Sequence, residues 1–230
     1  KAAMAMIMDK LADNCYLRAN KILLEQIKRS NGKFRIAFSI SGTTLELFEQ
    51  FRPELIDSFR ELVDTGCVEI LGETYYNSFS WLHSIQEFDC QVKEHETLIK
   101  KLFGYQPMVF RNTGFIHDND LAKHIAGMGY KGMLTDGVVE LLNSRSPNQT
   151  YAAPGNGDFG LLLRNAELSE DIACWIGKAK GSRYALTAEK FAERVFRDHV
   201  GNSCAINIFL DYETFGIHKT ENTGIFKFLE

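Results

Sequence analysis

The chain has 230 residues, which is enough for one domain with a substantial buried core. Apolar residues make up 45% and charged residues 24%, proportions that exclude disorder as a description of the whole chain. The 26 basic and 30 acidic residues give a formal charge of −4, so we expect no nucleic-acid partner.

The sequence also argues against a membrane protein and against a fold held together by disulfides. No apolar run is long enough to cross a bilayer and no signal peptide opens the chain, so we expect no membrane partner. The five cysteines are far apart and form no C-x-x-C pair, which favours reduced thiols and a cytoplasmic location. Because position 1 is not Met and both ends fall in helical patterns, we expect residues 1–230 to be one domain truncated at both ends.

The first half of the chain predicts alternating helices and strands from its apolar spacing. The expected elements are a helix from about residue 4 to Asn31, a strand over 34–40, a helix over 53–65, a strand over 68–71 and a helix over 86–103. Strict alternation in the first strand places Phe34 and Phe38 on one face and Ala37 and Ser39 on the other.

The second half continues the same alternation. The expected elements are a strand over 108–111, a helix over 118–126, strands over 131–135 and 160–163, helices over 170–176 and 188–200, and a strand over 205–211. Residues 155–160 spell G-x-G-x-x-G, but they follow Pro154 and run into a strand, so we interpret them as a turn and not as a dinucleotide loop.

Repeated strand-then-helix units predict an α/β fold with parallel strands. An open doubly wound sheet and a closed barrel both satisfy the pattern. The small residues Ala37 and Ser39 slightly favour the barrel, where they would face a crowded interior.

One sequence cluster raises the question of a metal. His117, Asp118, Asp120 and His124 lie close together, and the two histidines would share a helix face. However, Asp118 is suited to cap the helix that follows it, and a third strong ligand is absent from the pattern. We therefore expect no metal and no cofactor.

Polar residues gather where four strands end, in segments 72–78, 110–114, 134–137 and 210–218. In a parallel barrel such positions converge on one mouth, where function is normally housed. One interpretation is that Glu73, Arg111 and Asp136 form ion pairs that lock the loops. Four such segments with carboxylates, amides and aromatic rings favour a polyol-binding cleft instead, with flat faces from Tyr75, Tyr76, Trp81, Tyr212 and Phe215.

Several of these segments together resemble the α-amylase-like branch of glycoside hydrolase family 57, over essentially the whole chain. The segments that carry the resemblance are Val68–Tyr76, Val109–Thr113, Leu161–Asn165, Asp211–Gly216 and Thr223–Phe226. The resemblance implies an incomplete parallel (β/α)7 TIM-like barrel, α-glucan substrates, and a retaining two-carboxylate mechanism without a metal. It assigns the acid/base to Asp211.

The chain departs from the family pattern at three positions. Gly114 stands where the family has its nucleophilic Glu, Asn77 stands where a His contacts the sugar, and Thr220 replaces a common Trp. A retaining glycosidase needs two carboxyl groups about 5 Å apart, so we expect catalysis to be impaired. The expected glucan-binding residues are Glu73, Tyr75, Tyr76, Asn77, Arg111, Asn112, Asp136, Tyr212, Glu213, Phe215 and His218.

Two other functions stay open at this point. One is an active α-glucan hydrolase or 4-α-glucanotransferase in which Asp118 or Glu73 substitutes for the missing nucleophile. The other is a metal-dependent polysaccharide deacetylase, which is disfavoured because the sequence lacks an Asp-Asp pair and an H-x-x-x-H ligand set.

Overall fold

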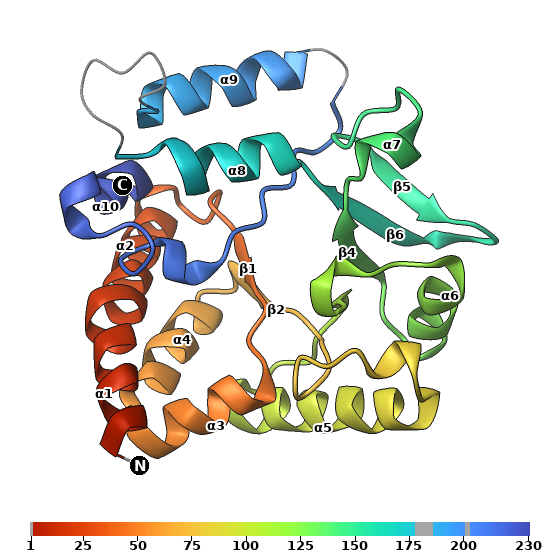
Figure 1. Cartoon of the computed structure of the whole chain (residues 1–230), viewed down its shortest axis with the longest axis horizontal. Helices are drawn as coiled ribbons and strands as arrows, with labels where there is room; N and C mark the ends of the chain where they lie inside the picture. The colour runs from red at the N-terminus through yellow and green to blue at the C-terminus, as the bar shows by residue number, and fades with distance from the viewer. Residues whose placement is uncertain (1, 178–185, 201–202) are drawn as a thin grey trace.

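The structure is a computed structural model that describes residues 2–177, 186–200 and 203–230. Short strands occupy its centre and helices surround them (Figure 1). The helices are α1 (Ala2–Leu11), α2 (Leu17–Arg29), α3 (Gly42–Phe51), α4 (Glu54–Asp64), α5 (Ile85–Phe103), α6 (Asn119–Gly127), α7 (Val139–Leu142), α8 (Ala166–Trp175), α9 (Ala188–Val200) and α10 (Ile225–Leu229). The strands are β1 (Ile36–Phe38), β2 (Val68–Ile70), β3 (Val109–Arg111), β4 (Gly132–Asp136), β5 (Thr150–Ala153) and β6 (Asn156–Arg164).

The strands form two sheets that isolated bridges connect. β1 pairs in parallel with β2, and β3, β4 and β6 pair in parallel in that order, with β5 antiparallel at the edge of β6. A parallel bridge from Gly72 to Phe110 joins the two sheets, and another from Arg164 to Asn207 adds the segment that follows α9. The result is an α/β fold with the strand arrangement of a partial TIM-like barrel, as predicted.

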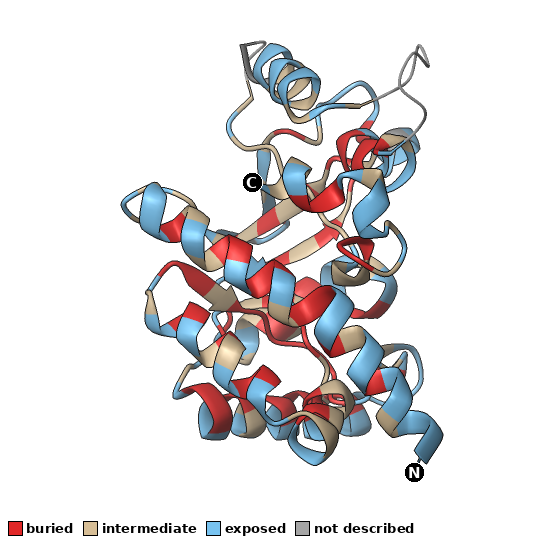
Figure 2. Cartoon of the chain, turned by 90° about the vertical axis from the view of Figure 1, so that its left-hand side faces the viewer, coloured by how far each residue is buried: buried red, intermediate tan, exposed pale blue. Residues whose placement is uncertain are grey.

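The N-terminal helix runs from α1 to α2 through one π-helical turn at Ala12–Tyr16. Its buried residues alternate with exposed ones along its length (Figure 2), because one stripe packs on the core. The helix ends where Asn31 and Gly32 adopt left-handed conformations, with φ of 51° and 75°.

Local capping confirms the predicted ends of two other helices. The Ser84 side chain accepts a hydrogen bond from the Glu87 N–H at the start of α5, which ends at left-handed Gly104. Asp118 caps α6 by accepting from the Leu121 N–H at 2.7 Å. These side chains satisfy helix-end groups that would otherwise lack a partner.

The core has three parts. The first packs α1 to α4 against β1 and β2 around Phe48 and Phe59. The second packs α5 and α6 against β3, β4 and β6 around Phe88 and Phe110. The third joins α2, α8 and α10 around Phe226, so it ties the end of the chain to the N-terminal helix.

Three predicted elements differ in the structure. Helix α3 lies where no helix was predicted; Ser41 caps it by accepting from the Thr44 N–H, and its buried Leu45 and Phe48 are three residues apart. Helix α8 begins at Ala166 and not at residue 170, because Asn165 caps it. Strand β6 begins at Asn156, so of the glycine-rich segment 155–160 only Gly155 lies in the turn of the hairpin with β5 and the rest is strand, whereas a turn was predicted.

The predicted strand over 205–211 was wrong. The segment is extended but makes one bridge, between Asn207 and Arg164. Hydrogen bonds that involve side chains take the place of further backbone–backbone bonds to a neighbouring strand. Asn207 Nδ2 donates to the Leu163 carbonyl at 3.0 Å, and the Phe209 N–H donates to Ser169 Oγ at 3.2 Å. The segment still runs beside the end of β6, so it leads to the edge of the sheet where the other parallel strands have their carboxyl ends. This edge, with the loops that follow the strands, is the rim of the partial barrel.

Candidate active site

An ion pair links the carboxyl ends of β2 and β3. Glu73 is 2% exposed, accepts a hydrogen bond from Ser39 Oγ at 2.8 Å, and lies 3.6 Å from the Arg111 guanidinium. Burial raises the pKa of Glu73, while the Ser39 hydroxyl and Arg111 act in the opposite direction. This pair is the loop-locking contact that the sequence offered as one interpretation. Glu73 therefore has two partners of its own and is not a free carboxylate.

The loop after β2 is tied to the loop after β3. Asn77 has φ of 50°, a left-handed conformation that asparagine tolerates. Its side-chain oxygen accepts hydrogen bonds from Arg111 at 3.1 Å and from Thr113 Oγ1 at 3.0 Å. Asn77, which stands in place of a family histidine, is thus a structural link between two loops.

Gly114 lies exposed on the loop after β3, with φ of 63°. A Cβ at this position would lie 3.4 Å from the Phe79 ring, in ordinary van der Waals contact. The next ring along the chain, Phe115, stacks on Phe209 with 5.3 Å between centroids. This stacking brings the Gly114 loop to the segment that carries Asp211, two residues after Phe209.

Asp211 is exposed at the end of the extended segment, and the residues after it are anchored inside. Tyr212 is partly buried and packs against the first core, where its hydroxyl donates to Asn20 Oδ1 at 2.5 Å. Glu213 accepts a hydrogen bond from the hydroxyl of Tyr16, which belongs to the π-helical turn. Gly216 passes so close to that turn that an added Cβ would lie 1.8 Å from the Asn14 carbonyl oxygen.

The remaining predicted binding residues divide between the rim and the core. Tyr76 is 54% exposed, and His218 is exposed. Asp136 lies 3.8 Å from Arg164 at the ends of β4 and β6. In contrast, Tyr75 and Phe215 are buried, and so is Asn112, whose side-chain oxygen makes no hydrogen bond within the described part of the chain.

Tyr75 and Phe215 are buried and Tyr212 packs against the first core, which corrects the expectation of open flat faces. Tyr75 lies over Gly42, which leaves no room for a side chain there, and donates to Glu46 Oε1 at 2.8 Å. Phe215 packs in the third core. Aromatic residues at a strand end serve packing as readily as binding, and here packing accounts for these three.

The described residues contain no group of three or more side chains placed to hold a metal. In the sequence cluster around α6, His124 pairs with Asp89 at 2.6 Å. Both oxygens of Asp118 are used, one by the Leu121 N–H and one by the Trp81 indole N–H at 2.8 Å. These contacts weaken the case for Asp118 as a substitute nucleophile.

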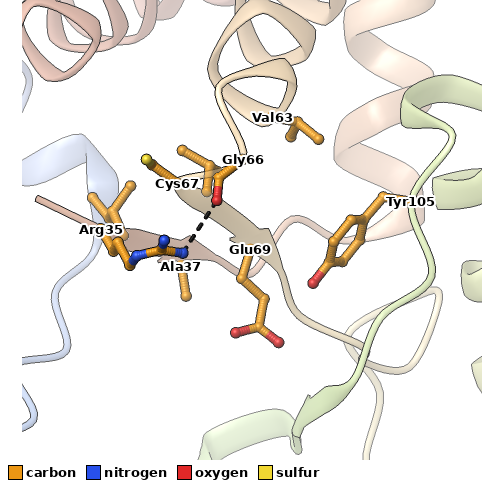
Figure 3. A pocket seen from close by; sticks show the side chains of 9 residues that line it. Arg35, Ala37, Val63, Gly66, Cys67, Glu69 and Tyr105 are labelled. Carbon is orange, nitrogen blue, oxygen red and sulfur yellow. Dashed lines mark hydrogen bonds between the residues drawn. The ribbon is translucent and has the colours of Figure 1, made fainter. Parts of the chain in front are cut away.

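A cavity of about 520 Å³ lies beside β1 and β2 (Figure 3). Its lining includes Arg35, Ala37, Glu69 and Tyr105, and Arg35 donates to the Gly66 carbonyl at 3.2 Å. Arg35 and Tyr105 precede β1 and β3, and Ala37 and Glu69 are the middle residues of β1 and β2. Ala37 and Ser39 are both exposed, so the prediction that they face a crowded interior is wrong.

Sequence reasoning missed four residues of the rim. Ser39 and Thr113 complete its hydrogen bonds, while Phe79 and Phe115 border Gly114. Strand alternation could have identified Ser39, because it lies on the same side of β1 as Ala37. No pattern marks Phe79, whose position depends on the folding of its loop.

The fold is that of a partial TIM-like barrel, and the comparisons identify its family. The whole chain, residues 1–230, matches Glycosyl hydrolase family 57, and the chain belongs to that family. It is 37% identical over 224 residues to a Methanocaldococcus jannaschii protein provisionally named an α-amylase. That alignment covers 97% of this chain and 46% of the relative, so the chain spans about half the relative's length.

Solved structures show the same fold at low sequence identity. The 4-α-glucanotransferase of Thermococcus litoralis superposes with a TM-score of 0.76 at 17% identity, covering 97% of this chain and 34% of that one. A family 57 branching enzyme of Thermococcus kodakaraensis gives a TM-score of 0.70 at 12% identity, covering 98% and 64%. In the described residues, no helix is long and apolar enough to span a membrane.

Proposed function

We propose that this chain is an α-glucan-binding domain of the α-amylase-like type, with Asp211 in the acid/base position and turnover impaired at Gly114. The observation that carries the proposal is Gly114 itself, which stands at the family's nucleophile position and offers no carboxylate. The names of its relatives, an α-amylase, a glucanotransferase and a branching enzyme, support α-glucans as ligands.

The geometry of the rim supports a shared cleft. The Phe115–Phe209 stacking joins the Gly114 loop to the Asp211 segment, and Asp211 is exposed. A retaining mechanism places one carboxylate on each side of the sugar, about 5 Å apart. With glycine on one side, the route through a covalent glycosyl-enzyme intermediate is lost. This loss raises the activation free energy by on the order of 5 kcal/mol or more.

A substitute carboxylate is less well supported. Glu73 is buried, carries a raised pKa and is held by Ser39 and Arg111. Asp118 caps α6 and accepts from Trp81. A nucleophile must be ionised and free to approach the anomeric carbon, and neither group combines the two properties.

The proposal is tested by restoring the acid. The unmodified chain is expected to bind maltoheptaose without measurable hydrolysis. Gly114→Glu should raise hydrolysis by about 100-fold over Gly114→Gln, which has the same size and backbone strain but no carboxylate. Reducing-sugar release and calorimetric binding measure the two quantities. Hydrolysis by the unmodified chain that Asp211→Asn abolishes would contradict the proposal, and so would absence of glucan binding.

A further inference from the structure

The loop between β2 and α5 presents two aromatic rings to solvent, and one of them, Phe79, borders Gly114. Tyr76 is 54% exposed and Phe79 is 53% exposed. Exposed aromatic rings carry an unfavourable contact with water that a ligand can relieve. Phe79 is such a ring next to the candidate site, whereas the Tyr76 ring lies against Tyr75, with 4.9 Å between centroids.

The loop is held in one conformation by its own hydrogen bonds. The Ser78 N–H donates to Thr74 Oγ1 at 2.9 Å, and the Ser78 hydroxyl donates to Gln91 Oε1 at 2.8 Å. Asn77, between the two rings, accepts from Arg111 and Thr113. Binding therefore costs little additional ordering of this loop, which favours a ligand that meets the rings where they stand.

Phe79 borders the space in front of Gly114. Its ring lies 3.4 Å from where a Cβ at position 114 would be, with a second ring carbon at 3.9 Å. The first atom of any side chain at position 114 would run along this ring. Because residue 114 is glycine, the surface at this point consists of the edge of the Phe79 ring and exposed backbone. In the family pattern a carboxylate side chain would lie there.

From this geometry we infer that Phe79 is a stacking platform for a glucose unit of an α-glucan at the Gly114 side of the cleft. A pyranose ring has an apolar C–H face that packs on an aromatic ring, and its hydroxyl edge needs polar partners. The amide of Asn77 and the guanidinium of Arg111 lie in the same loop pair and supply those partners. The inference deepens the proposed function and rests on it.

The test compares variants of one loop in maltoheptaose binding by calorimetry. Phe79→Ala should weaken binding about 10-fold, which is the size of aromatic stacking contributions. Phe79→Tyr should stay within about 2-fold, because it keeps the ring. Leu82→Ala is the matched control, since Leu82 is 55% exposed on the same loop, and it should leave binding unchanged.

The outcomes separate this inference from the proposed function. If the unmodified chain does not bind maltoheptaose, the proposed function fails and this inference fails with it. If it binds and Phe79→Ala binds equally well, or if Phe79→Ala and Leu82→Ala weaken binding alike, the inference alone is overturned. Should Phe79→Ala lose its folded circular dichroism, Phe79→Leu and Phe79→Tyr decide: only the tyrosine variant should keep the affinity.

Discussion

The two sides of the proposed cleft are held in different ways. On the Asp211 side, residues 214–216 are buried, and Tyr212 and Glu213 are hydrogen-bonded to the N-terminal helix at Asn20 and Tyr16. On the Gly114 side, the backbone is exposed and Asn77 and Arg111 make the linking hydrogen bonds. A change at position 114 thus touches little of the core, whereas a change in the 212–216 turn disturbs it.

The largest effect should come from crowding the Asp211 side. Gly216→Ala places a Cβ 1.8 Å from the Asn14 carbonyl oxygen at a φ of 116°, so we expect a loss of about 3 kcal/mol or more of unfolding free energy. Gly224→Ala is the control, because it shares a positive φ of 78° but meets no atom within 4 Å. It should cost about 1 kcal/mol. Equal losses in urea unfolding would show that the turn is not packed as described.

A smaller effect should follow from removing one hydroxyl on each side. Tyr212→Phe leaves the oxygen of buried Asn20 without its donor, which should cost about 1–3 kcal/mol. Tyr76→Phe removes a hydroxyl from a ring that is half exposed and should change stability by less than about 0.5 kcal/mol. Urea unfolding at pH 7 compares them. A Tyr76→Phe loss as large as that of Tyr212→Phe would remove the contrast between the two sides.

The smallest effect is a pH dependence on the Gly114 side. Because burial raises the pKa of Glu73 above its ordinary 4.5, the folded chain holds a proton there that the unfolded chain has released. The contribution of Glu73 to the free energy of unfolding is therefore fully present below pH 4.5. It declines as the pH rises toward the pKa of Glu73 in the folded chain, by at most about 1.4 kcal/mol per pH unit.

Two variants change this slope in opposite directions. Glu73→Gln should flatten the decline in unfolding free energy, because it cannot ionise. Ser39→Ala should extend the decline to higher pH, because the Ser39 hydroxyl stabilises the ionised form. Urea unfolding between pH 4.5 and 7.5 measures both. Parallel curves for the unmodified chain and Glu73→Gln would mean that Glu73 does not titrate in this range.

Much of the fold follows from local patterns in the sequence. Helices α4, α5 and α6 were predicted from apolar spacing, together with Gly66 at the end of α4 and the Asp118 cap at the start of α6. The prediction of a strand over 205–211 was wrong. The apolar composition of the segment suits a strand, but its Phe209 N–H donates to a side chain, Ser169 Oγ, and not to a neighbouring strand. Those partners come from elsewhere in the chain, and no local pattern contains them.

The candidate site was predictable in its location and less so in its details. Strand ends predicted that Glu73 and Arg111 lie near each other, and the 3.6 Å between their charged groups agrees, since parallel strands end together. Sequence could not tell that Tyr212 packs against the core and Phe79 is at the surface, because both follow a strand end and both are aromatic. That distinction depends on the packing of Tyr212 against Phe38, with 5.1 Å between ring centroids.

The most direct measurement asks whether an external anion can act from the Gly114 side while Asp211 acts from the other. An activated α-maltoside, 4-nitrophenyl α-maltoside, is incubated with the chain and azide, and the products are followed by proton NMR. Azide should attack the anomeric carbon as nitrophenol leaves with the Asp211 proton, giving a maltosyl azide of β configuration. Gly114→Gln and Asp211→Asn should each abolish it. A bound maltoside that yields no azide product, or a yield unchanged in both variants, would contradict an arrangement in which these two positions flank one sugar.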